Sequence, residues 1–376
     1  MNIGILKETL EHESRVAITP EIAKKLISAN HKVHIESGAG EKSFFSDQHY
    51  SDIGCIVEND SKSIYNCHLI LKVNAFNNEE LENSKPETSL ISFFQIKDNV
   101  NLLPNYLNKK ITLLSMSHIP RTTLAQNMDA LSSQSNIAGY KSTIIAADHT
   151  SKYMPLLMTA AGTIKPSKVL ILGAGVAGLA AIANAKRMGA QVFAFDVRPV
   201  VKEQVESLGA KFIEVESDTD EGTGEGGYAK EVSEEYKKKQ GLLIEETIKT
   251  MDIIISTALI PERKAPILIT EKMVQSMMPG SVIMDLAAQN GGNCELTKCD
   301  QVITHNNVII DGRSNLPSTM AADASQLYAK NVYNFLTHLY KDDNKLNLDD
   351  EITSGSMLLN NGSVCNETVK QFLDKG

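Results

Sequence analysis

Three glycines at the spacing G-x-G-x-x-G lie near the middle of the chain, at Gly173, Gly175 and Gly178. The aliphatic run 169–172 before them predicts a buried parallel strand, and the alanine-rich run 179–188 after them predicts a helix. Such a turn lets the backbone approach a pyrophosphate, while the helix N-terminus presents unpaired N–H groups to the phosphates. The pattern therefore predicts that a dinucleotide binds along Gly173, Ala174, Gly175, Val176, Ala177 and Gly178.

An acidic residue ends the next predicted strand. The run 191–195 is largely aliphatic and aromatic, and Asp196 follows it. A carboxylate here can accept hydrogen bonds from both hydroxyls of an adenosine ribose and repels a 2′-phosphate, which favours NAD(H) over NADP(H). Arg198 follows closely, and an arginine near this acid can accommodate a 2′-phosphate. We interpret Arg198 as a surface residue that lies, with Val197, beside the nucleotide.

Two further predicted strands supply loops that we expect to line the ligand crevice. The strands are predicted at 252–256 and 281–285, and small residues follow both. In a doubly wound sheet the loops at the carboxyl ends of the strands form the crevice in which ligands bind. The residues of these loops that are predicted to approach the cofactor are Thr257, Ala258, Leu259 and Gln289.

A glycine-rich and acidic segment at 214–227 interrupts the alternation of strands and helices. Its composition cannot bury a core, which predicts a mobile surface loop. The segment is either a solvated insertion or a lid whose Tyr228, preceded by Gly227, covers the bound nucleotide. From the residues alone, the solvated insertion is the favoured interpretation.

Length and composition restrict the class of protein. A chain of 376 residues with 42% hydrophobic and 22% charged residues is typical of a soluble globular protein with two domains. The net charge of −9 argues against nucleic acid as a partner, and no apolar run predicts a membrane span. The first residues do not have the pattern of a signal peptide. Five scattered cysteines without a C-x-x-C pair predict a reducing cytoplasm and no metal site.

The order of the predicted elements indicates an α/β fold with two domains, each a mostly parallel sheet flanked by helices. We expect residues 1–130 and the C-terminal segment 321–376 to form the N-terminal domain, with a helix at about 321–339 returning the chain to it. Residues 131–320 are predicted to form a Rossmann domain that binds NAD(H). A helix that starts at Thr122 or Thr123 is predicted to enter it, and Asn-Asn-Gly at 360–362 predicts a hairpin.

Several longer stretches resemble the soluble NAD(H)-binding component, domain I, of the proton-translocating nicotinamide nucleotide transhydrogenases. The resemblance covers nearly the whole chain and is strongest in GILKE at 4–8, ESRVAITPE at 13–21, RTTLAQNMDALSSQSNIAGY at 121–140, VKEQVESLGAKF at 201–212, GGYAKE at 226–231, TALIP at 257–261 and DLAAQNGGNCE at 285–295. It implies that Tyr228 is a lid residue. It also implies that a loop reaches the nicotinamide with Arg121, Gln126, Asp129 and Ser132. Considered without the resemblance, Gln126, Asp129 and Ser132 are polar residues on one exposed helix face.

The resemblance implies direct hydride transfer between NAD(H) on this chain and NADP(H) on a partner domain. Transfer between two nicotinamides moves no proton at the site, so no general acid or base is needed. The family implies a homodimer that associates with the NADP(H)-binding domain and with membrane-spanning subunits that translocate protons. This gives a cytoplasmic location, peripheral on the cytoplasmic face of the inner membrane. Two departures from the family pattern are Leu124, where a second Arg is common, and Glu262, where a Gly is usual.

Alanine dehydrogenases share this two-domain framework and provide the main alternative. Arg15 and Lys72 match the positions that hold the substrate in those enzymes, although both could instead form surface or interdomain ion pairs. Reductive amination needs a proton shuttle, supplied there by a His and an Asp. This chain has Gln95 and Gln289 at the matching positions, and glutamine cannot titrate. A NAD(H)-sensing module that binds the nucleotide without hydride transfer is a third possibility.

Overall fold

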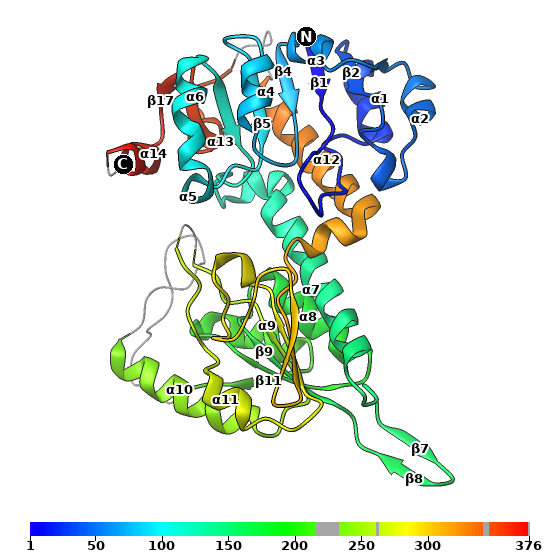
Figure 1. Ribbon diagram of the computed structural model, residues 1–376, viewed down its shortest axis with the longest axis vertical. Helices are drawn as coiled ribbons and strands as arrows, with labels where there is room; N and C mark the ends of the chain where they lie inside the picture. Colours follow the sequence, from blue (N-terminus) through cyan, green and yellow to red (C-terminus); the bar gives the residue numbers. More distant parts are fainter. Residues whose placement is uncertain (216–232, 261–262, 341–345, 375–376) are drawn as a thin grey trace. The chain divides into compact units, whose positions relative to one another are not determined.

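The computed structural model describes residues 1–215, 233–260, 263–340 and 346–374. The chain folds into two compact units, Met1–Gln134 with Pro317–Gly376, and Ser135–Leu316. Each unit contains one large sheet with helices packed against it (Figure 1). These observations confirm the predicted α/β class with two mostly parallel sheets. The unit boundaries lie a few residues away from those predicted at 130 and 321.

The sheet of the first unit has the strand order β17-β16-β6-β5-β4-β1-β2-β3. Strands β1 to β6 pair in parallel, and the C-terminal strands β16 and β17 extend the sheet in antiparallel fashion. Asn361 and Gly362 between them have positive φ, as a type I′ turn requires, which confirms the predicted hairpin. The strands are β1 (Asn2–Ile5), β2 (Lys32–Glu36), β3 (Ile56–Glu58), β4 (Leu69–Leu71), β5 (Ser89–Ser92), β6 (Thr112–Ser115), β16 (Met357–Asn360) and β17 (Ser363–Val364).

Both faces of the first sheet are buried, because alternate side chains of each strand point to opposite faces. Leu69 and Leu71 of β4 belong to one core cluster, and Ile70 belongs to the other. The helix predicted at 321–339 is confirmed as α12 (Ala321–Leu339), and its apolar stripe completes the first cluster. The other helices of this unit are α1 (Pro20–Ser28), α2 (Asp47–Ser51), α3 (Lys62–Tyr65), α4 (Asn78–Asn83), α5 (Ile96–Asn99), α6 (Leu103–Asn108), α13 (Glu351–Ser356) and α14 (Glu367–Leu373).

The sheet of the second unit has the strand order β11-β10-β9-β12-β13-β15-β14, and all neighbours pair in parallel except β15 and β14. Its parallel strands follow the doubly wound Rossmann order, and the order reverses between β9 and β12. The strands are β9 (Lys168–Leu172), β10 (Gln191–Phe195), β11 (Lys211–Ile213), β12 (Ile253–Ser256), β13 (Val282–Asp285), β14 (Val302–His305) and β15 (Val308–Asp311). The helices are α8 (Val176–Arg187), α9 (Lys202–Ser207), α10 (Glu234–Ile248) and α11 (Glu271–Gln275).

A long helix, α7 (Ala130–His149), begins in the first unit and continues into the second. The prediction that it starts at Thr122 or Thr123 is wrong, because Thr123–Met128 forms a separate 3-10 turn, η3. After α7 the chain forms an antiparallel hairpin of β7 (Leu157–Thr159) and β8 (Gly162–Ile164), which the sequence did not predict. Figure 1 shows that this hairpin projects away from the sheet of its own unit.

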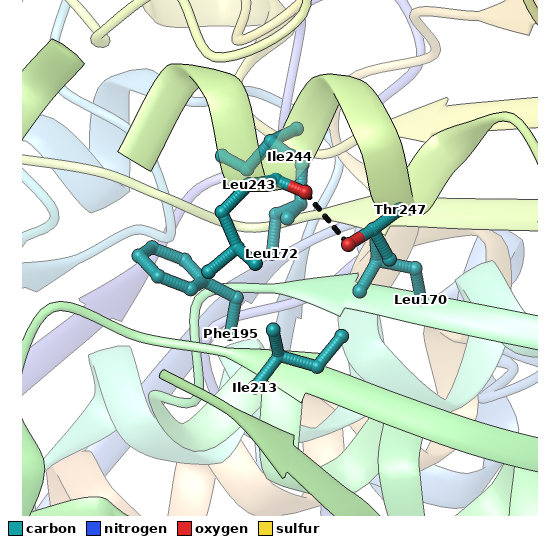
Figure 2. Close-up of a pocket in the computed structure, with 7 residues that line it drawn as sticks. All are labelled: Leu170, Leu172, Phe195, Ile213, Leu243, Ile244 and Thr247. Atoms are coloured by element: carbon teal, nitrogen blue, oxygen red, sulfur yellow. Dashed lines mark hydrogen bonds between the residues drawn. The ribbon is translucent and has the colours of Figure 1, made fainter. Parts of the chain in front are cut away.

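Helix α10 covers one face of the second sheet and leaves a small hollow beneath it (Figure 2). The hollow holds about 160 Å³ of empty space and is lined by strand residues Leu170, Leu172, Phe195 and Ile213 and helix residues Leu243, Ile244 and Thr247. Among these side chains, the one hydroxyl, Thr247 Oγ1, already donates to the carbonyl oxygen of Leu243 at 2.7 Å. A polar ligand would gain little there, and ligands of such sheets bind instead at the carboxyl ends of the strands.

Candidate functional site

The glycine-rich turn connects β9 to α8 where the strand order of the second sheet reverses. Gly173 has a φ of +98°, a conformation that favours glycine, and its N–H donates to the carbonyl oxygen of Phe195 at 2.8 Å. A Cβ on Gly178 would lie 1.9 Å from the carbonyl oxygen of Gly173. These two glycines therefore bring the first turn of α8 directly onto the strand.

Gly175 differs from the other two glycines, since nothing lies within 4 Å of the position that its Cβ would take. It is the residue before α8, and no side chain caps the helix at this position. The first N–H groups of a helix have no partner inside the helix and carry a partial positive charge. An approachable backbone at a helix N-terminus fits a phosphate group, so the residues of the turn fit a dinucleotide.

Asp196 is held against this turn by hydrogen bonds to both of its carboxylate oxygens. Oδ2 accepts from the N–H of Ala174 at 2.7 Å, and Oδ1 accepts from the N–H of Arg198 at 2.9 Å. The guanidinium of Arg198 donates to the same carboxylate, from Nε to Oδ1 at 2.8 Å and from Nη2 to Oδ2 at 2.7 Å. The interpretation of Arg198 as a surface residue is therefore wrong. Its side chain is only 13% exposed, and hydrogen bonding to Asp196 raises the pKa of Arg198.

The loop after β12 contacts the glycine-rich turn directly. The N–H of Thr257 donates to the carbonyl oxygen of Leu172 at 2.8 Å, and its Oγ1 donates to that of Gly173 at 3.0 Å. Ala258 is held by Asn293, whose Oδ1 accepts from the N–H of Ala258 and whose Nδ2 donates to its carbonyl oxygen. The structure thus brings Thr257 and Ala258 to the turn, and Leu259 follows as an exposed residue.

Asn293 and Asp285 are functional-site residues that the sequence reasoning missed. Asn293 is fully buried, and its Oδ1 also accepts from the hydroxyl of Ser256 at 2.7 Å. Asp285, at the end of β13, accepts from the N–H groups of Asn293 and Cys294 and from the hydroxyl of Thr297. Their signal was the acid that ends a strand and the asparagine after two glycines. Gln289 lies between them in a 3-10 turn, η6 (Ala288–Asn290), and is exposed.

The residues implied for the nicotinamide end lie in the first unit, where η3 meets α7. Asp129 occupies the position before α7, and it accepts from the N–H of Ser132 at 2.8 Å and from its hydroxyl at 2.6 Å. Arg121 and Gln126 are exposed. The interpretation that Gln126, Asp129 and Ser132 share one helix face is therefore wrong, because a capping aspartate breaks the helix between the first and the last.

Helix α12 fixes the position of η3. The carbonyl oxygen of Asn127 accepts from the side chains of Asn331 and Asn334 at 2.9 and 3.0 Å. Ala125 and Met128 are buried in the core of the unit, whereas Leu124 is 80% exposed. The loop that carries Gln126 is thus anchored on both sides. The predicted residues Gly227, Tyr228 and Glu262 lie outside the described residues.

Arg15 forms a buried ion pair within the first unit, which corrects the expectation of a surface or interdomain pair. Its Nε and Nη2 donate to the two carboxylate oxygens of Glu13 at 2.8 and 2.6 Å, and Nη1 donates to Oε1 of Gln134 at 2.9 Å. Burial would raise the pKa of Glu13, but the hydrogen bonds and charge of Arg15 lower it to about 2. Glu13 therefore occupies the guanidinium where an external carboxylate would bind.

Lys72 also forms buried ion pairs within the first unit. Its Nζ lies 2.5 Å from Oε1 of Glu80 and 4.0 Å from Oε2 of Glu8. Glu8 accepts from the N–H of Val73 at 2.6 Å and from Nδ2 of Asn74 at 3.0 Å. Burial raises the pKa of Glu8, and the charge of Lys72 opposes the rise. Both cations of this region are thus engaged by the protein's own carboxylates.

The remaining predictions concern metals, membranes and the dehydrogenase alternative. Gln95, which stands where the alternative requires a titratable residue, is exposed before α5. Within the described part of the chain, no group of three or more His, Cys, Asp or Glu side chains is arranged to hold a metal ion. No helix in the described ranges is long and apolar enough to cross a bilayer.

A doubly wound sheet with this glycine-rich turn at its switch point defines the class of dinucleotide-binding α/β proteins. Two family models match the chain. The model described as "Alanine dehydrogenase/PNT, N-terminal domain" matches residues 4–138, and "Alanine dehydrogenase/PNT, C-terminal domain" matches residues 142–367. The chain belongs to the alanine dehydrogenase/PNT family.

Relatives place the chain near one branch of this family. It is 43% identical to the first of the chains that make up NAD(P) transhydrogenase subunit alpha in Rickettsia prowazekii, over 99% of this chain and 98% of the relative. It is 44% identical to the protein of the same name from Rhodospirillum rubrum, over 97% of each chain. The solved structure of a transhydrogenase from Sinorhizobium meliloti is 38% identical, with a TM-score of 0.85, and the match covers 98% of this chain and all of that one.

Proposed function

We propose that this chain is the NAD(H)-binding component of a proton-translocating transhydrogenase. NAD(H) bound here exchanges hydride directly with NADP(H) bound to a partner domain. The observation that carries the proposal is the turn from β9 to α8, where the backbone at Gly175 is open to approach and Asp196 lies against Ala174. The names of the relatives from Rickettsia prowazekii and Rhodospirillum rubrum support the activity.

In this proposal the second unit binds the adenosine end and the phosphates. The residues from Gly173 to Gly178 hold the pyrophosphate, and Asp196 holds the adenosine ribose. Val197, Arg198, Thr257, Ala258, Leu259 and Gln289 complete the nucleotide site. When bound, the nicotinamide supplies or accepts the hydride, and the chain binds, orients and shields it.

The first unit orients the nicotinamide in this proposal. Arg121 and Asp129 hold its carboxamide and ribose, and Gln126 reaches toward the second nucleotide. The hydrogen bonds between Asp129 and Ser132 restrict the carboxylate to one orientation, which is what hydride transfer between two rings in near contact requires. No general base is involved, because no proton moves at this site.

The buried ion pairs argue against an alanine dehydrogenase activity. A substrate carboxylate would have to displace Glu13 from Arg15, and Lys72 is already paired with Glu80. Neither Gln95 nor Gln289 can donate or accept a proton as the shuttle of that reaction must.

The proposal includes partners. The hairpin exposes apolar side chains at and beside its strands, and these fit contact with a second copy of the chain; they are Tyr153, Leu156, Met158 and Ile164. The homodimer then associates with the NADP(H)-binding domain and with membrane-spanning subunits that translocate protons. The chain is peripheral on the cytoplasmic face of the inner membrane in this arrangement.

The test is hydride transfer from NADPH to an NAD⁺ analogue after this protein is mixed with a purified NADP(H)-binding partner domain. Transfer should require both proteins, and Gln126→Ala or Arg121→Ala should slow it about 10–100-fold because orientation is lost. Gln48→Ala, a change of an exposed glutamine on α2, is the matched control and should leave the rate unchanged. Alanine-dependent NADH formation without the partner would refute the proposal, and NADH binding without transfer would favour a sensor.

A further inference from the structure

The carboxylate of Asp196 has its acceptor capacity filled by the protein itself. A carboxylate offers about four lone-pair positions. Four donors meet these oxygens: the N–H of Ala174, the N–H of Arg198, and Nε and Nη2 of Arg198. A ribose hydroxyl that is to donate to Asp196 must therefore displace one of them or share its position.

The four donors are not equally replaceable. The N–H of Ala174 belongs to the turn fixed by Gly173, and the N–H of Arg198 belongs to the backbone directly after β10. The two guanidinium bonds depend only on a side chain with rotatable bonds, so they can be exchanged with the least disturbance. Any competition for Asp196 is therefore between the ligand and the side chain of Arg198.

Charge adds a second effect at the same place. An acid at the end of this strand discriminates against NADP(H) by repelling its 2′-phosphate. The bidentate guanidinium places a positive charge against that acid, with 13% of the Arg198 side chain and 5% of the Asp196 side chain exposed. Because the pair is shielded from solvent, the opposite charge offsets much of the repulsion.

We propose that Arg198 is a specificity-determining residue that weakens the preference of this site for NADH over NADPH. It does so by competing with the adenosine ribose for Asp196 and by offsetting the repulsion of a 2′-phosphate. This inference rests on the proposed assignment of Asp196 to the ribose. Arg198 acts through Asp196 and need not touch the nucleotide, so it is a positioning residue.

The test compares dissociation constants of NADH, NADPH and 2′-deoxy-NADH for the full chain and its variants, measured by calorimetry without any partner. In Arg198→Met, which keeps the length of a largely buried side chain, the ratio of the NADPH to the NADH constant should rise about tenfold or more. Removal of the 2′-hydroxyl should also weaken binding more in Arg198→Met than in the unaltered chain. Arg198→Lys keeps the charge and should keep the ratio near its original value.

Two controls separate the possible results. Arg187→Met, at the exposed end of α8, should change neither ratio. If Arg198→Met unfolds the second unit, Arg198→Gln replaces it in the same comparison. Equal weakening of all three ligands would mean that Arg198 only holds Asp196 in place and would overturn the inference. Absence of NADH binding by the unaltered chain would instead refute the proposed function.

Discussion

Gly139 of α7 lies so close to Ala177 of α8 that a Cβ on the glycine would be 2.0 Å from the alanine carbonyl oxygen. Thr143, one turn further along α7, spans the same crossing, with its Oγ1 3.0 Å from the carbonyl oxygen of Gly139 and 3.4 Å from that of Ala181. Helix α8 carries the proposed phosphate site at its N-terminus. The crossing at Gly139 therefore supports the position of that site from behind.

Replacement of Gly139 should show what this contact contributes. Gly139→Ala should lower the free energy of unfolding by about 2 kcal/mol, because the new methyl group forces the helices apart. The control is Gly241→Ala in α10, where nothing lies within 4 Å of the added Cβ. There the better helix propensity of alanine should raise the free energy by about 0.5–1 kcal/mol. Urea unfolding measures both, and a stabilising Gly139→Ala would contradict the close crossing.

Gly175 should separate folding from binding. Its φ of −76° suits any residue and its Cβ would meet nothing, so Gly175→Ala should leave the free energy of unfolding within about 0.5 kcal/mol of the original. The same methyl group should lie in the path of the pyrophosphate and weaken NADH binding about tenfold or more. Gly241→Ala should leave the affinity unchanged. Unaltered NADH affinity in Gly175→Ala would place the phosphates elsewhere.

Glu13 should contribute to stability in a pH-dependent way. Its folded pKa of about 2 is below the ordinary value of 4.5, so its contribution is present above pH 4.5 and is lost as the pH falls from there toward 2. Glu13→Gln leaves Arg15 buried without its carboxylate and should cost about 3–5 kcal/mol at pH 6. At pH 3.5 that difference should be about 1 kcal/mol smaller.

Urea unfolding at both pH values checks this prediction. Glu79→Gln, a change of an exposed carboxylate on α4, should show no such narrowing. A difference between the original chain and Glu13→Gln that stays constant from pH 6 to pH 3.5 would show that the pair is not ionised as described.

Lys72 should be coupled to Glu80 in stability. Lys72→Met leaves the buried carboxylates of Glu80 and Glu8 without their cation and should cost about 3–5 kcal/mol of unfolding free energy. Adding Glu80→Gln removes one unpaired charge and keeps an oxygen for the N–H of Asn77, which Glu80 now bonds at 2.9 Å. A double-mutant cycle should give a coupling above about 1 kcal/mol. Additive effects would mean that the pair contributes nothing of its own.

The hairpin should control self-association. Met158 in β7 is 77% exposed, and Met158→Glu should place a charge in the proposed contact between two copies and weaken it about tenfold or more. Sedimentation equilibrium measures the change. Leu242→Glu, which alters an exposed leucine on α10, controls for the added charge and should leave the association unchanged. Loss of association in both variants would remove the hairpin from the interface.

The sequence by itself determined those elements whose signals lie within a few residues. The predicted strand at 169–172, helix at 179–188 and strand at 191–195 correspond to β9, α8 and β10, because contiguous aliphatic residues and turn glycines act locally. The hairpin turn at Asn361 and Gly362 was predictable for the same reason, since few residues accept positive φ. The α/β class follows from the alternation of such elements.

Only the tertiary structure decided which polar groups meet. Register between parallel strands brings Asn293 to Ser256 and Ala258, and the packing of η3 against α12 ends the helical pattern at Asp129. The pairing of Lys72 with Glu80, and the burial of Arg198 against Asp196, likewise depend on what surrounds each residue in space. A buried polar group must find a partner wherever the fold places one, and local sequence patterns carry no information about that partner.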